Sequence, residues 1–219
     1  MNKLLCLFIA IIGLVRCIYA QQSVKERSLE QELEIHSKKV QLPYGTAALK
    51  KVHFPVQWYC GGGYLETSLR KAGLSDKDSI RFSKPYFDMI AFNKDADQDT
   101  TLSTLTIPQV LDSIPGKGRA YGFIQLPRIN GFSIFGILVR QDDRFFNPYY
   151  ITVKGDKICD TLTAYESSAT AVQSNKIIFV DKDGSFYTRT FTNIDGYEVH
   201  NGPLERYTIN NSGKFQRRR

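Results

Sequence analysis

Three side chains in this sequence have the types that a thiol hydrolase needs. Cys60 precedes three glycines at residues 61–63, where a strand-like run ends and residues at helical spacing begin. A thiolate at the start of a helix is stabilised by the helix dipole, and it needs a histidine as its base. His200 follows 140 residues later in a strand-like run, and Gln57 lies three residues before Cys60. One hypothesis is therefore a nucleophile at Cys60, a base at His200 and an oxyanion donor at Gln57.

This arrangement resembles the papain-like proteases in outline only. The Cys-Gly-Ser-Cys-Trp signature of that family is absent, and Trp58 precedes the cysteine instead of following it. No Gly-x-Ser-x-Gly elbow for a serine nucleophile occurs either. The sequence therefore holds no complete catalytic pattern.

A second use of Cys60 is a disulfide with Cys159. These two cysteines remain once an N-terminal leader is removed, and an exported chain meets an oxidising compartment. A bridge that closes a loop of about 100 residues would contribute roughly 4.7 kcal/mol in the chain-entropy treatment. Two buried thiols are the alternative, because cysteine packs as a small apolar residue. The sequence leaves both open.

A third candidate is a row of side chains in the C-terminal half. In a strand, Tyr187, Arg189 and Phe191 fall on one face because successive side chains alternate. Such a face would bind a glycan or a protein partner through its aromatic rings. Cross-strand packing inside a β core is the competing expectation, since aromatic residues favour strands in any case.

Metal and cofactor sites have little support. Asp95, Asp97 and Asp99 alternate as in the opening of a calcium loop, but Thr100 and Thr106 stand where an EF-hand needs glycine and glutamate. Only a weak, irregular calcium site is left for these aspartates. The histidines are scattered, without zinc-binding spacing, and no phosphate-loop or dinucleotide fingerprint occurs. We expect no cofactor.

The first twenty residues are typical of a signal peptide. Lys3 is followed by an apolar run over residues 4–15, which is shorter than the roughly 20 residues that span a bilayer. Cleavage after Ala20 predicts a secreted or periplasmic protein, with an uncleaved membrane anchor as the alternative. Lipidation at Cys17 is disfavoured because Arg16, a large residue, precedes it.

The positive charge is concentrated at the two ends of the chain. The net charge of +7 becomes +5 without Lys3 and Arg16, and Lys214 together with the three arginines at 217–219 supplies +4 of that. A basic chain end is usually solvated, so a nucleic-acid partner is not expected. After residue 20 there is no apolar run of 18 residues, and we expect no transmembrane segment in the mature chain.

Glycine-containing turns predict many short antiparallel strands. The clearest is Asn130-Gly131 between strand-like runs at 120–126 and 132–139, since Asn-Gly favours the type I′ hairpin turn. Further strands are expected at residues 149–153, 158–164, 176–180, 186–192, 197–200 and 205–209. The run at 82–92 is also expected to be extended, and helices are expected at 28–36, 64–72 and 106–114.

The prediction is a β-rich α+β fold, with a meander that forms a sandwich-like or barrel-like sheet and a few short helices in the N-terminal half. Its parts are a signal peptide at 1–20, a polar helical or partly disordered lead-in at 21–42, one globular domain at 43–215 and a basic tail at 216–219. Apolar residues make up 42% of the chain, which is enough for a buried core. The leading hypothesis is an exported, non-enzymatic binding or envelope-associated protein. The thiol hydrolase is the alternative.

Overall fold

The computed structural model describes residues 27–60, 81–90, 102–114, 119–140, 146–163, 172–194 and 198–218. Short helices lie in the N-terminal half, at α2 (Leu29–Ile35), α3 (Ala48–Lys51), residues 81–90 and α6 (Pro108–Ser113). Strands dominate the described part of the chain, and the predicted β-rich α+β fold is confirmed. Within the described ranges, no helix has the length and apolar character needed to cross a membrane.

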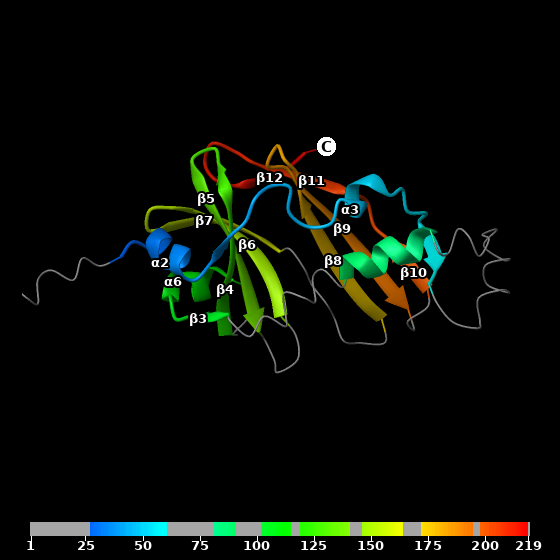
Figure 1. Cartoon of the computed structure of the whole chain (residues 1–219), viewed down its shortest axis with the longest axis horizontal. Helices are drawn as coiled ribbons and strands as arrows, with labels where there is room; N and C mark the ends of the chain where they lie inside the picture. Colours follow the sequence, from blue (N-terminus) through cyan, green and yellow to red (C-terminus); the bar gives the residue numbers. More distant parts are fainter. Residues whose placement is uncertain are drawn as a thin grey trace, which may run out of the picture.

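Sheet A forms one end of the molecule (Figure 1). Its order is β1-β4-β5-β6-β7, and β3 pairs with β4 beside β1. Every pairing is antiparallel except that of β1 with β4. The bounds of its strands are β1 (Lys38–Lys39), β3 (Ser103–Leu105), β4 (Arg119–Ile129), β5 (Phe132–Arg140), β6 (Phe146–Lys154) and β7 (Lys157–Thr163).

The hairpin of β4 and β5 follows from its turn. Asn130 and Gly131 have φ angles of 52° and 80°, the positive values that a type I′ turn requires. A register shift follows Leu126, at the position of Pro127, which has no backbone donor. The predicted hairpin is confirmed.

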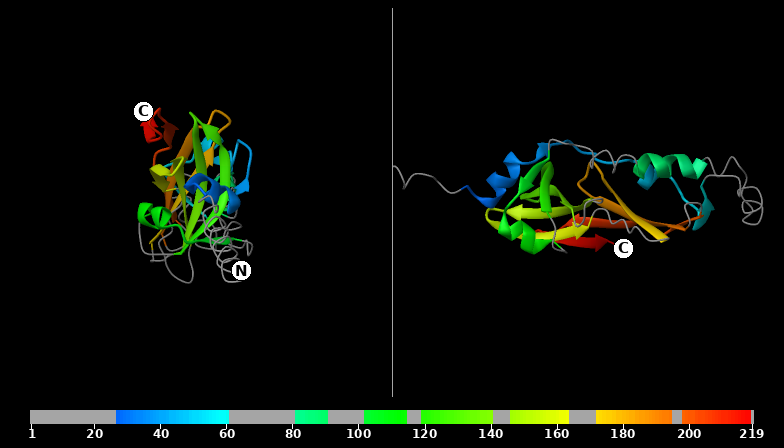
Figure 2. Two further views of the ribbon diagram at one scale, coloured as in Figure 1. Left: turned by 90° about the vertical axis from the view of Figure 1, so that its left-hand side faces the viewer. Right: turned by 90° about the horizontal axis from the view of Figure 1, so that it is seen from below.

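Sheet B forms the other end (Figure 2). Its order is β12-β11-β9-β10-β2, and β8 pairs with the free side of β9. All of its pairings are antiparallel. The bounds of its strands are β2 (Gln57–Tyr59), β8 (Val172–Val180), β9 (Phe186–Ile194), β10 (Glu198–Asn201), β11 (Glu205–Ile209) and β12 (Phe215–Arg218).

Three apolar clusters hold these layers together. The aliphatic cluster packs α2 and α6 against sheet A, and includes Leu29, Leu33, Val110, Ile137 and Ile151. The aromatic cluster packs α3 and the helix at 81–90 against sheet B, and includes Phe54, Trp58, Tyr86, Ile177 and Phe191. The central cluster joins the two sheets, and includes Ile124, Ile134, Tyr150, Val180 and Phe186.

The chain passes between the sheets more than once. Residues 29–39 contribute α2 and β1 to sheet A, and residues 48–59 contribute α3 and β2 to sheet B. Residues 103–163 then complete sheet A, and residues 172–218 complete sheet B. No single cut of the chain separates the two sheets.

Two local expectations need correction. Residues 81–90 are helical and not extended, because Phe82, Tyr86 and Met89 occupy one side at helical spacing and are buried in the aromatic cluster. The basic end forms a strand, because β12 pairs with β11. For the lead-in, the structure has the helical alternative, since α2 is fixed by a capping box at Ser28 and buries its leucines.

Candidate functional site

The predicted binding row lies on the face of sheet B that carries the aromatic cluster. Tyr187 and Phe191 both pack with this cluster, and the guanidinium carbon of Arg189 lies 5.7 Å from the ring centroid of Phe54. The three side chains therefore share one face of β9, but their surroundings differ along the strand.

One end of the row is closed. The ring centroid of Phe191 lies 5.1 Å from that of Phe54, 5.8 Å from that of Trp58 and 5.2 Å from that of Tyr86. All four rings are buried. Edge and tilted ring contacts of this kind stabilise a core beyond the burial of area. Phe191 therefore has the packing role that the sequence left as the alternative, and it offers no surface to a partner.

The other end is open and cationic. Tyr187 is half-buried, with the ammonium of Lys50 4.7 Å from its ring centroid and the guanidinium carbon of Arg206 at 5.8 Å. Lys50 is supplied by α3, and Arg206 lies directly across from Tyr187 on β11. Two cations against one ring create a patch that favours an electron-rich or anionic partner.

The turn between β8 and β9 supplies carboxylates to both cations. Asp181 pairs with Lys50, and this hydrogen bond lowers the pKa of the aspartate and raises that of the lysine. Asp183 pairs with Arg206 at 3.1 Å, and the backbone N–H of Ser185 is the first cause that lowers its pKa. Both carboxylates are charged at neutral pH, and each already has a cation.

The proposed thiol-hydrolase residues are not brought together. In the antiparallel pairing of β2 with β10, Gln57 lies opposite His200, so their side chains share a face. Cys60 follows Tyr59, and its side chain points to the opposite face, where it packs beside Trp58 with 1% of its surface exposed. Burial raises the pKa of the Cys60 thiol to about 11. The structure therefore gives a protonated, enclosed thiol, separated from His200 by the sheet.

Gln57 and His200 belong instead to a polar group on the other face. The amide of Gln57 donates to Glu198 and, at 3.3 Å, to the hydroxyl of Tyr59. The same carboxylate oxygen lies 2.5 Å from Nε2 of His200. Alternation along two paired strands brings these four half-exposed side chains together.

The predicted disulfide is absent. Cys60 and Cys159 are both thiols, one in the aromatic cluster and the other beside the central cluster. Cys159 is the extra residue at a register shift in β7, since Thr152 pairs with Asp160 and Val153 pairs with Ile158. The two cysteines therefore contribute to packing at different places, and of the two alternatives that the sequence leaves open the structure has the thiols.

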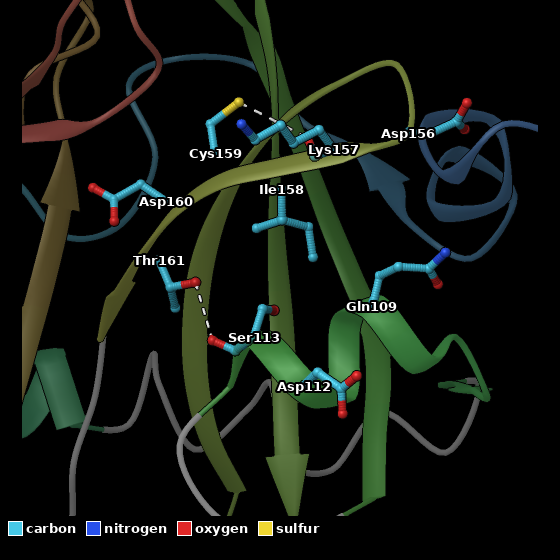
Figure 3. Close-up of a pocket in the computed structure, with 9 residues that line it drawn as sticks. All are labelled: Gln109, Asp112, Ser113, Asp156, Lys157, Ile158, Cys159, Asp160 and Thr161. Atoms are coloured by element: carbon cyan, nitrogen blue, oxygen red, sulfur yellow. Dashed lines mark hydrogen bonds between the residues drawn. The ribbon is translucent and has the colours of Figure 1, made fainter.

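A shallow groove of about 560 Å³ lies between α6 and β7 (Figure 3). It is lined by Gln109, Asp112, Ser113 and residues 156–161. Asp156 accepts a hydrogen bond from the backbone N–H of Leu29, and Asp160 accepts one from that of Phe215. These two carboxylates therefore fix neighbouring segments in place.

The metal candidates lie elsewhere. Asp95, Asp97 and Asp99 are outside the described residues. Within the part of the chain that the structure describes, no three histidine, cysteine or acidic side chains gather as metal ligands would.

No protein-family model, curated protein or solved structure matches this chain.

Several residues of these sites were not singled out from the sequence. Lys50 and Arg206 come from segments far from β9, and no local pattern connects them with Tyr187. Glu198 had a readable pattern, because Glu-x-His and Gln-x-Tyr each place two polar side chains on one strand face. Once β2 is known to pair with β10, these two patterns predict that Glu198 and His200 meet Gln57 and Tyr59.

Proposed function

We propose that this chain is an exported, non-enzymatic protein that binds a glycan or protein partner at the open end of β9. One observation supports this above the others. Tyr187 is half-exposed between two cations, next to a rigid aromatic core. A pre-formed aromatic and cationic patch on a rigid sheet is a favourable place for recognition, because little ordering is needed on binding.

Export is supported by the pattern of the first twenty residues, which combine a basic start, a short apolar run and a small residue at the cleavage position. N-terminal sequencing of the protein from its host tests this part. A mature chain that begins at Gln21 and is found outside the cytoplasm is expected. A chain that retains Met1 and stays in the cytoplasm would contradict export.

Binding is tested by photo-crosslinking at the patch. His53 is exposed and lies between Lys50 and Phe54 in the chain, so a benzophenone amino acid there reaches a partner on the patch. The matched control carries the same group at Asn211, an exposed position in the turn between β11 and β12. In the host, a discrete adduct at position 53 that is absent at position 211 is expected. No adduct at 53, or the same adduct at both positions, would overturn the binding patch.

The thiol-hydrolase alternative has no comparable support. The buried, protonated Cys60 and the position of His200 across the sheet both count against it. An activity-based probe for reactive cysteines provides the check. Labelling of Cys60 in the folded protein at pH 6 would revive the alternative.

A further inference from the structure

Arg189 is a charged group without a counter-charge. It lies at the middle of the binding row, directly across from the buried Ile177 on β8 and against the ring of Phe54. Its Nε atom is buried and makes no hydrogen bond, and among the described residues no carboxylate pairs with the guanidinium. An arginine in this position is surrounded by apolar side chains.

This arrangement is costly for the protein alone. A guanidinium stays protonated, so it cannot escape a dry environment by losing its charge. A half-buried cation without an acceptor therefore reduces the free energy of unfolding unless a partner supplies one. Burial also lowers the pKa of Arg189.

The neighbouring charges do not satisfy Arg189. Asp181 and Asp183, in the turn before β9, are paired with Lys50 and Arg206, and Glu205, across from Thr188, is paired with Arg217. Tyr187 is two residues from Arg189 on the same strand face, which places the two side chains about 7 Å apart. One unpaired cation therefore lies beside a ring that two further cations already flank.

We infer that Arg189 binds a carboxylate group of the partner, so that the open end of β9 recognises an acidic sugar. This rests on the proposed binding function and names the chemistry of its ligand. A guanidinium and a carboxylate match as two planar forks with parallel hydrogen bonds. A carboxylate is favoured over a phosphate because Phe54 and Ile177 make the surroundings of Arg189 apolar. Removing water from a doubly charged phosphate costs more free energy there than removing it from a singly charged carboxylate.

The side chain of Arg189 reports this binding directly. In ¹⁵N-labelled protein of the full mature chain, the Nε–H signal of Arg189 is followed during titration at constant ionic strength. The probes are acetate, glucuronate, glucose and inorganic phosphate. We expect a saturable shift with acetate and glucuronate, and no shift with glucose, which is the neutral counterpart of glucuronate. A phosphate response as strong as that of acetate would overturn the carboxylate class. No response to any anion would overturn the anion site.

A variant separates a binding role from a structural one. Arg189→Met keeps an unbranched apolar stem and removes the charge. If the guanidinium awaits a ligand, this variant should have a higher Tm than the wild type without ligand and should lose at least tenfold in glucuronate affinity. A lower Tm would show that the guanidinium stabilises the free protein and would contradict the inference.

The matched control is Arg128→Met. Arg128 is an exposed arginine on β4 of sheet A that pairs with Glu30 on α2. It should leave the response of the Arg189 signal to glucuronate unchanged. The crosslinking test is independent of these results: an adduct at position 53 without any anion response would keep the binding patch and reject only the ligand class.

Discussion

The two ends of the molecule use the same plan with different side chains. Each has a six-stranded sheet whose outer face is covered by short helices from the N-terminal half. The cluster on sheet A is mainly aliphatic, and its partners α2 and α6 close over it. The cluster on sheet B is built from interlocking rings, and it ends at Tyr187 and Arg189, where cations replace apolar neighbours. Sheet A is therefore closed by apolar side chains over its cluster, and sheet B leaves an aromatic and charged end, where we propose that a partner binds.

The sharpest test of this comparison removes one phenylalanine from each cluster. Phe135 in sheet A and Phe191 in sheet B are both fully buried. Each Phe→Ala substitution should reduce the free energy of unfolding by about 3–5 kcal/mol. Phe191→Ala should cost about 1 kcal/mol more, because it also loses ring contacts with Phe54, Trp58 and Tyr86. Urea unfolding measures both. An equal or smaller loss at Phe191 would show that the rings add nothing beyond burial.

A glycine tests how closely sheet A is covered. A Cβ atom at Gly122 on β4 would lie 2.2 Å from the carbonyl oxygen of His36, at the end of α2. Gly122→Ala must therefore displace α2, and we expect a loss of about 3 kcal/mol in the free energy of unfolding.

The control for this substitution is Gly202→Ala on sheet B. There the added Cβ would lie 3.4 Å from the carbonyl oxygen of Thr190 and 3.9 Å from its Cβ atom, which are ordinary van der Waals distances. Its effect should stay within about 1 kcal/mol. Similar losses for the two variants in urea unfolding would mean that α2 is not held tightly on sheet A.

The buried thiol of sheet B predicts a pH dependence. The pKa of Cys60 is raised to about 11 by burial, whereas an exposed cysteine ionises near pH 9. Above pH 9 the unfolded state binds fewer protons than the folded state, so the free energy of unfolding falls as the pH rises. The stabilising contribution is complete below pH 9 and is lost as the pH passes about 11. The loss is about 2–3 kcal/mol.

Unfolding curves of the wild type and Cys60→Ala between pH 8 and 11 measure this contribution. The variant should lose less stability with rising pH than the wild type. Cys159→Ala keeps the buried thiol and should follow the wild type. Parallel curves for all three proteins would show that Cys60 is not enclosed.

The smallest expected difference concerns the helix ends. Ser28 caps α2 with a complete capping box, whereas Ala47 before α3 has helical backbone angles and no capping side chain. Ser28→Ala should reduce the free energy of unfolding by about 1 kcal/mol. Ala47→Ser should change it by less than about 0.5 kcal/mol, since a cap needs an extended backbone there. Guanidinium titrations resolve the pair, and a gain from Ala47→Ser would contradict the structural difference.

The sequence predicted what depends on neighbouring residues. The Asn130-Gly131 hairpin, the capping box at Ser28 and the alternation of Tyr187, Arg189 and Phe191 all follow from spacing over a few residues. It did not predict which segments cover which strands. The helix at 81–90 covers Phe191, although the two lie about one hundred residues apart in the chain. Its aromatic residues favour a strand on their own, so the sequence predicts an extended segment there.

The sites show the same limit. Sequence spacing placed Gln57 and His200 as partners of Cys60, and strand pairing brings the first two together while alternation turns the third away. A shift of one residue along β2 reverses the facing of every side chain. Which face each side chain of β2 takes depends on its pairing with β10, and the sequence of β2 alone does not identify that partner strand.

The pairing of β2 with β10 has a consequence for how the molecule forms. Gln57 meets His200 across 143 positions of the chain, so the second sheet closes only after nearly all of the polypeptide is available. Contacts between segments this far apart slow folding, because the long intervening loop must be closed first. A nascent chain of this kind therefore keeps sheet B open for longer than a local meander would, while every strand of sheet A is available by residue 163.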